Sequence, residues 1–191
     1  MSSLLIAPLR LSQAGRAAHD LGLAGLLGGN LFGRLALHPS VTEISDAEER
    51  GKVVNAAWRR YGTINSLSLL AVVGGWAPGR LREITPRTLS PAELRLARAK
   101  DALVGVVAVT GLATAAQGVA FSRMAPSGAV PLTDGSHTAP AATQPEHRAK
   151  RRLDRLGRAS LAAEVALVAV NAALAQEGFR RPPARRFLRR L

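Results

Sequence analysis

Five polar residues interrupt long apolar segments of the sequence and have the clearest capacity for chemistry: Asn30, Arg34, Asn65, Gln117 and Glu164. A carboxylate among apolar residues is costly to keep charged, so it needs an opposite charge, hydrogen-bond donors or a function. We predict that Arg34 pairs with Glu164. Two interpretations remain open: a structural ion pair with amide hydrogen bonds that fixes the order of helices, or a polar site for a small ligand, ion or proton.

The sequence lacks the patterns typical of a metal centre, a haem site or a nucleophilic enzyme. It contains no cysteine, which excludes disulfides and thiolate ligands. His19 and His38 lie at opposite ends of one apolar segment, and His137 and His147 lie in a proline-rich stretch. Histidines on facing helices at one depth, as a haem held between helices needs, are therefore not expected. There is also no P-loop and no Ser-His-Asp arrangement. We expect no metal and no cofactor, and we favour a non-enzymatic protein.

The polar residues lie within four apolar segments, residues 17–37, 61–79, 102–122 and 157–177. A helix needs about 20 residues, with a range of ~17–25, to cross the hydrocarbon core of a bilayer. Residues 102–122 contain no charge and are apolar all round, which argues against the alternative of a soluble helical domain. Trp58 and Trp76 bracket the second segment, as interfacial tryptophans do. The predicted fold class is all-α: an integral membrane four-helix bundle, with residues 1–191 as one domain.

Segments outside these spans carry their own signals. Ser90, Pro91 and Glu93 match a capping box with proline in the first turn, so a helix should begin there. Residues 124–147 hold four prolines without apolar periodicity, and we expect a disordered loop. Residues 178–191 form a basic C-terminal tail suited to anionic lipids. The side that carries the termini has slightly more basic residues, which predicts a multi-pass protein of the cell membrane with cytoplasmic termini.

Glycines recur along one face of the first segment. Since successive helical residues advance by about 100°, four of them share a narrow arc: Gly22, Gly25, Gly29 and Gly33. Small residues at this spacing let helix backbones approach closely in a membrane. We expect this face to pack within the same chain and the opposite leucine face to contact lipid, while packing against another copy or another membrane protein stays open.

The chain carries 26 Lys and Arg against 13 Asp and Glu, a net charge of +13. Such a balance suits either nucleic acid or an anionic membrane surface. No RNP motif, zinc finger or aromatic-interleaved basic patch is present, so nucleic acid is not the expected partner. The expected partner is the lipid bilayer.

His19, the pair Gly28-Gly29 and Phe32 resemble the first helix of small bacterial four-helix membrane proteins, including copper-resistance D-like and anthrone-oxygenase-like domains. Copper handling or oxygenase chemistry is what this resemblance implies. The chain departs from the copper branch by having two methionines, no cysteine and no second histidine within a span. We take His19, Gly28 and Gly29 as motif positions without a catalytic role. The favoured function is an accessory or small-ligand-binding membrane protein, with an oxygenase-like enzyme or a transporter or channel component as alternatives.

Overall fold

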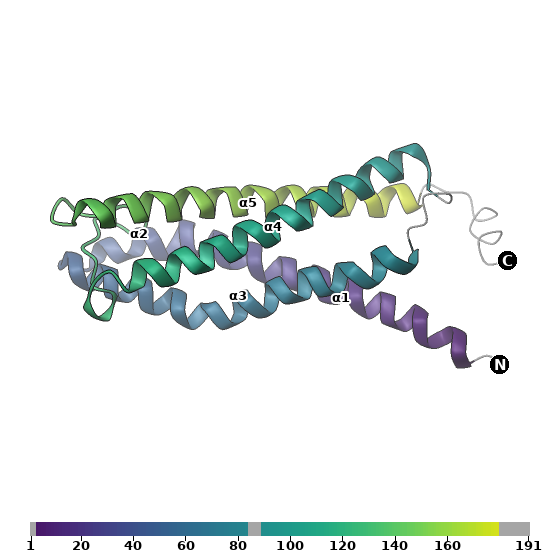
Figure 1. Cartoon of the computed structure of the whole chain (residues 1–191), viewed down its shortest axis with the longest axis horizontal. Helices are drawn as coiled ribbons and strands as arrows, with labels where there is room; N and C mark the ends of the chain where they lie inside the picture. The colour runs from purple at the N-terminus through teal and green to yellow at the C-terminus, as the bar shows by residue number, and fades with distance from the viewer. Residues whose placement is uncertain (1–2, 84–88, 180–191) are drawn as a thin grey trace.

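Four long helices run alternately in opposite directions in the computed structural model, which describes residues 3–83 and 89–179 (Figure 1). They are α1 (Ser3–Phe32), α3 (Ala47–Glu83), α4 (Pro91–Ser122) and α5 (Gln144–Phe179). Short turns η1 (Gly33–Leu37), α2 (His38–Ser40) and η2 (Val41–Glu43) link α1 to α3, and η4 (Pro126–Gly128) follows α4. The described part of the chain contains no strand, so the all-helical expectation is confirmed.

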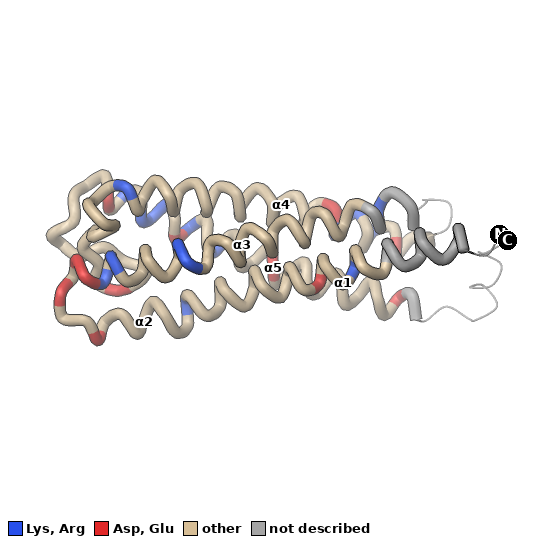
Figure 2. The backbone as a smooth tube through the Cα atoms, turned by 90° about the horizontal axis from the view of Figure 1, so that it is seen from below, with Lys and Arg blue, Asp and Glu red and all other residues tan. Residues whose placement is uncertain are grey.

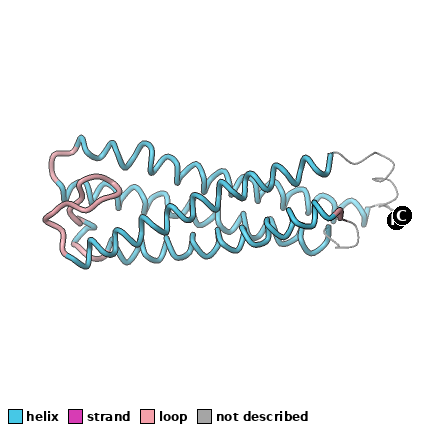
Figure 3. The backbone as a smooth tube through the Cα atoms, turned by 90° about the horizontal axis from the view of Figure 1, so that it is seen from above, coloured by secondary structure: helices cyan, strands magenta, loops and turns pink. Residues whose placement is uncertain are grey.

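The four helices form an antiparallel bundle with two distinct ends. α1 packs mainly against α3 and α4 mainly against α5, while contacts of α1 with α5 and of α3 with α4 close the bundle. The N-terminus of α1, the C-terminus of α5, the end of α3 and the start of α4 lie together at what we call the termini end (Figure 1). The connections from α1 to α3 and from α4 to α5 lie at the opposite, loop end (Figure 3).

The start of α4 follows the predicted capping box. The Ser90 hydroxyl accepts a hydrogen bond from the Glu93 amide at 3.2 Å, and the Glu93 carboxylate accepts one from the Ser90 amide at 2.8 Å. Pro91 occupies the first turn, where its missing N–H leaves no bond unmade. The helix therefore begins well before the apolar segment 102–122, as expected from the sequence.

Large apolar side chains remain exposed on all four long helices. We call this surface the apolar belt: Leu21, Leu31, Phe32, Leu35, Ile64, Leu67, Leu70, Val106, Val109, Leu112, Val119, Val165 and Val168. Figure 2 shows most charged residues nearer the two ends of the bundle, with a mainly uncharged middle. Of the long helices in the described residues, α4 and α5 are long and apolar enough to cross a membrane.

Glycines bring α1 and α3 close together. A methyl group added at Gly22 would lie 2.5 Å from the Ser68 carbonyl oxygen, and one at Gly29 would overlap the Tyr61 ring. Gly25 and Gly33 likewise face α3 side chains. The prediction that these glycines pack within the same chain is confirmed for all four.

The connection between α4 and α5 corrects the expectation of a disordered loop over residues 124–147. Val130 and Leu132 are fully buried against the loop end of the bundle. The Leu132 amide donates to the Ala47 carbonyl at 2.9 Å, and the Arg50 guanidinium donates to the Thr133 carbonyl at 2.9 Å. The prolines do not prevent order here, because the buried side chains of Val130 and Leu132 anchor the segment to the bundle.

Candidate functional site

Glu164 lies at the centre of the bundle and has only 1% of its surface exposed. The Asn30 side-chain amide donates from Nδ2 to both carboxyl oxygens, at 2.8 and 2.9 Å. Ser160 donates its hydroxyl hydrogen to Oε1 at 2.9 Å. We call these three residues the Glu164 site. Both donors are neutral, so a charged Glu164 would have hydrogen bonds but no cation bonded to it.

Helical spacing explains why these residues meet. Ser160 and Glu164 lie four residues apart on α5 and therefore share a face. That face continues through Ala163 and Leu167 into the central core, where Leu26 of α1 also lies. Asn30 lies one turn after Leu26, so the same face of α1 brings its amide to Glu164. The site is thus a polar break in an otherwise apolar helix contact.

The predicted pairing of Arg34 with Glu164 is wrong. Arg34 instead forms a salt bridge with Asp154 at 3.2 Å and donates to the Asp154 carbonyl at 3.1 Å. Arg158 pairs with the same carboxylate. Burial alone would raise the pKa of Asp154, but the hydrogen bonds and charges of Arg158 and Arg34 outweigh it and hold the pKa below its ordinary value.

The antiparallel course of α1 and α5 gives the reason for this correction. Arg34 lies about one turn after Asn30, in η1 where it continues α1, and this level corresponds to an earlier position along α5. Its guanidinium therefore passes Gly157, where an added methyl group would lie 3.0 Å from a guanidinium nitrogen, and reaches Asp154. The prediction places Arg34 and Glu164 in the same half of the bundle, but that level of detail does not distinguish two acidic residues ten positions apart on α5.

The other predicted site residues do not join Glu164. Within residues 3–83 and 89–179, no hydrogen bond connects Asn65 or Gln117 to its carboxyl group, and both side chains are half-buried. Sequence reasoning missed Ser160, although its spacing of four from Glu164 was a usable signal. It also missed Asp154, which lies in a charged stretch that the expected span excluded.

Polar contacts join α1 to α5 at three levels, and we call this line the polar seam. Towards the termini end, the Asn171 amide donates to Asp20 at 2.7 Å, and its oxygen accepts from Lys100 at 2.5 Å. The Glu164 site forms the middle level. The salt bridge of Arg34 with Asp154 forms the level nearest the loop end.

His19 is also buried, with 1% of its surface exposed. Its Nδ1 lies 2.7 Å from the Val72 carbonyl oxygen, which can only accept, so Nδ1 carries the hydrogen. Nε2 has no hydrogen-bond partner among the described residues. The motif glycines differ from each other: Gly29 packs beneath the Tyr61 ring, whereas Gly28 faces open space. No group of three or more potential metal ligands occurs within the described ranges.

A second polar cluster holds the loop end together. The Trp58 indole N–H donates to Nε2 of His38 at 3.3 Å, which leaves Nδ1 to donate to the Ser136 hydroxyl at 3.0 Å. Burial, with the nearby charges of Lys150 and Arg34, lowers the pKa of His38 to about 4. Burial also lowers the pKa of Lys150 to about 8, and its ammonium group donates to the Gly135 carbonyl at 2.6 Å. These bonds tie the α4–α5 connection to α2, α3 and α5.

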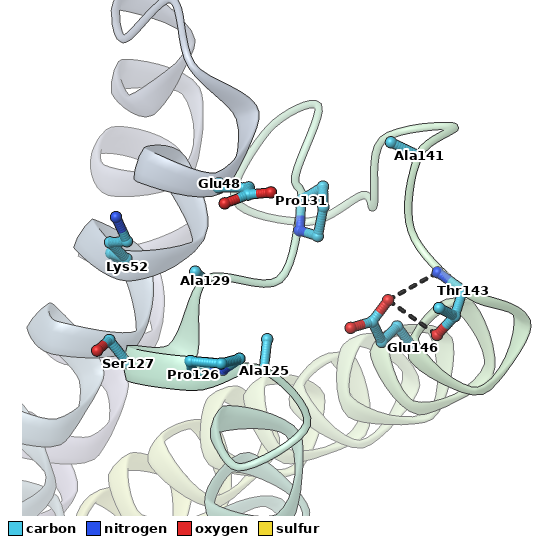
Figure 4. A pocket seen from close by; sticks show the side chains of 10 residues that line it. All are labelled: Glu48, Lys52, Ala125, Pro126, Ser127, Ala129, Pro131, Ala141, Thr143 and Glu146. Atoms are coloured by element: carbon cyan, nitrogen blue, oxygen red, sulfur yellow. Dashed lines mark hydrogen bonds between the residues drawn. The ribbon is translucent and has the colours of Figure 1, made fainter.

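An open hollow of about 510 Å³ lies beside this connection (Figure 4). The Thr143 amide and hydroxyl both donate to the Glu146 carboxylate, at 2.7 and 2.9 Å, and thereby cap the start of α5. The remaining lining is small or apolar, apart from Glu48, Lys52 and Ser127, and includes no histidine. This hollow therefore has less chemical capacity than the Glu164 site.

No protein-family model matches the chain, and neither a curated protein nor a solved structure matches it.

Proposed function

We propose that this protein is an integral membrane four-helix bundle that crosses the bilayer four times. The apolar belt supports this proposal, because soluble proteins rarely leave such continuous apolar surface in water. Leu21 on α1 and Leu35 in η1 are 74% and 75% exposed, and Val109 on α4 is 68% exposed. The uncharged residues 61–79 of α3 span about 28 Å as a helix, close to the thickness of a hydrocarbon core.

Within this bundle, we propose a non-enzymatic role in which the Glu164 site takes up a proton or a small cation. One observation carries the proposal: a fully buried carboxyl group whose two hydrogen-bond donors, Asn30 and Ser160, are both neutral. An anion in this position lacks a bonded counter-charge, and either a proton or a small cation supplies one. The protein would then act as an accessory subunit or small-ligand-binding component.

Infrared difference spectroscopy of protein reconstituted in vesicles tests this role directly. Stepping the pH should produce a carboxyl band that disappears in Glu164→Gln, because glutamine keeps a carbonyl oxygen for Asn30 and Ser160 but cannot ionise. Glu43→Gln is the matched control, since that side chain is exposed at the loop end. Adding lithium, sodium or potassium salts distinguishes cation from proton uptake. Identical spectra for wild type and Glu164→Gln would contradict the proposal.

Membrane insertion and orientation need separate tests. We expect the protein to remain in membranes after carbonate extraction, and a monodisperse protein that needs no detergent would contradict insertion. The absence of cysteine allows single-cysteine labelling from either side. The proposed cytoplasmic termini predict that Ser127→Cys, at the loop end, reacts with impermeant reagents from the outside.

An oxygenase-like enzyme is the second candidate, and His19 is the observation that favours it. The buried Nε2 has no hydrogen-bond partner and could accept a proton from a substrate. Oxygen uptake with an anthrone should then fall in His19→Gln and persist in Glu164→Gln. A transporter or channel component would instead require association with further copies or another membrane protein.

A further inference from the structure

One face of α5 near the loop end carries four exposed arginines: Arg148, Arg151, Arg152 and Arg155. We call them the arginine face. Their spacing of three, four and seven places all four on one side of the helix. The opposite side points inward, where Lys150 is buried and Asp154 pairs with Arg34. Asp154 of this helix therefore points inward, whereas the four arginines point outward.

The arginine face has no acidic partner. None of its four members forms a hydrogen bond or ion pair with the residues that the structure describes. Other arginines at this end are used internally: Arg50 donates to backbone carbonyl groups, and Arg34 and Arg158 share Asp154. The positive charge of the arginine face is therefore available to an external anion.

Arginines from two other helices lie at the same level. The loop-end core cluster, which includes Val54 and Phe121 with Leu153 packed against it, aligns α3, α4 and α5 there. Exposed Arg59 and Arg60 directly follow Trp58 of this cluster on α3, and exposed Arg123 lies two residues after its Phe121. On α3 and α4 they lie about one turn beyond the apolar belt, whose nearest members are Ile64 and Val119.

We propose that the arginine face, with these three flanking arginines, binds the phosphate groups of anionic phospholipids at the loop end. This inference rests on the proposed membrane insertion. Guanidinium groups bind phosphate oxygens through paired N–H donors, and long side chains beside an apolar surface reach the headgroup region of a bilayer. The occupant is a lipid rather than a soluble anion because the apolar belt begins about one turn from Arg60 and Arg123, at Ile64 and Val119, and would contact the acyl chains of the same molecule.

The two tryptophans allow a local test. Trp58 lies in the loop-end cluster, whereas Trp76 lies towards the termini end, where its N–H donates to Asp101. In the Trp76→Phe protein, Trp58 is the only tryptophan and can be excited selectively over the single tyrosine. Quenching by brominated phosphatidylglycerol, compared with brominated phosphatidylcholine, then measures lipid preference at the loop end. We expect a preference of roughly fivefold for the anionic lipid, weakened by added salt.

Substitutions test whether the arginine face causes the preference for anionic lipid at Trp58. Changing all four members of the arginine face to glutamine should bring the preference at Trp58 towards one, whereas changing all four to lysine should retain most of it. The control is Arg95→Gln with Arg98→Gln, two exposed arginines on α4 at the termini end, which should not alter quenching of Trp58. Far-UV circular dichroism checks that each variant keeps its helices.

The outcomes separate this inference from the membrane proposal. Equal quenching by both lipids, or an unchanged preference in the glutamine variant, would overturn anionic lipid binding while insertion stands. Quenching by neither lipid would overturn both. A preference that persists in the glutamine variant but falls in the Arg95→Gln, Arg98→Gln control would instead assign anionic lipid to the termini end.

Discussion

Two adjacent glycines on α3 offer a direct test of how α1 and α3 associate. A methyl group added at Gly75 would overlap the Gly15 carbonyl oxygen and lie 2.7 Å from the His19 amide nitrogen. Both are backbone atoms, so no side chain can move aside. A methyl group added at Gly74 meets nothing within 4 Å. The two positions therefore differ in space while sharing the same helix.

The difference between the two variants isolates the steric contribution. Replacing glycine by alanine within a helix stabilises by about 1 kcal/mol, and this gain is common to both positions. Overpacking destabilises by about 1–3 kcal/mol, and backbone contacts place Gly75→Ala towards the upper end. We expect Gly74→Ala to be slightly more stable than wild type, and Gly75→Ala to be about 2–3 kcal/mol less stable than Gly74→Ala.

Unfolding in mixed micelles by increasing dodecyl sulfate, followed by circular dichroism, measures these free energies. In a Trp58→Phe background, fluorescence of the neighbouring Trp76 gives a second, local readout. Equal effects of the two substitutions would refute the close contact between α1 and α3 at this level. If Gly74→Ala destabilised the protein while Gly75→Ala were tolerated, a different face of α3 would contact α1. That result would contradict the position of His19 described above.

Three further predictions concern the polar seam and the loop end. Arg34→Glu should destabilise the bundle. Adding Asp154→Arg should restore stability, whereas adding Glu164→Arg should not, and a double-mutant cycle in the same unfolding assay measures both effects. Because His38 has a lower pKa in the folded than in the unfolded protein, the stability of the folded protein should fall as the pH decreases from about 6.5 towards about 4. Limited proteolysis of the α4–α5 connection at several pH values measures this dependence, and His38→Gln should weaken it. Leu132→Ala removes a fully buried anchor, so it should cost about 2–5 kcal/mol and expose the same connection to protease.

Local signals in the sequence predicted several parts of this structure. The capping box at Ser90 depends on residues three positions apart, and the packing face of α1 depends on helical spacing, so neither needs knowledge of distant partners. The sequence groups Asn30 and Glu164 as polar residues within apolar segments, and the structure brings these two together. These features share one property, namely that the chain's own periodicity determines them.

Features set by distant contacts escaped prediction. The order of the α4–α5 connection depends on Val130 and Leu132 entering a core made by other helices, which proline content does not reveal. The partner of Arg34 depends on helix rotation and the reversed direction of α5, and charge attraction alone favoured the wrong acid. The basic tail at 178–191 lies outside the described residues.

The two helix contacts made by α1 stabilise the bundle in different ways, and this bears on Glu164. Within a bilayer, apolar burial gives little drive for helix association, so close packing and hydrogen bonds must supply it. The contact with α3 uses glycines, whereas the contact with α5 uses the polar seam. The hydrogen bond from Asn30 is therefore structural even where the carboxyl group is functional. Glutamine at position 164 preserves an acceptor for that bond and alanine does not, so a bundle that tolerates Glu164→Gln but loosens in Glu164→Ala would separate the carboxyl chemistry from the helix contact.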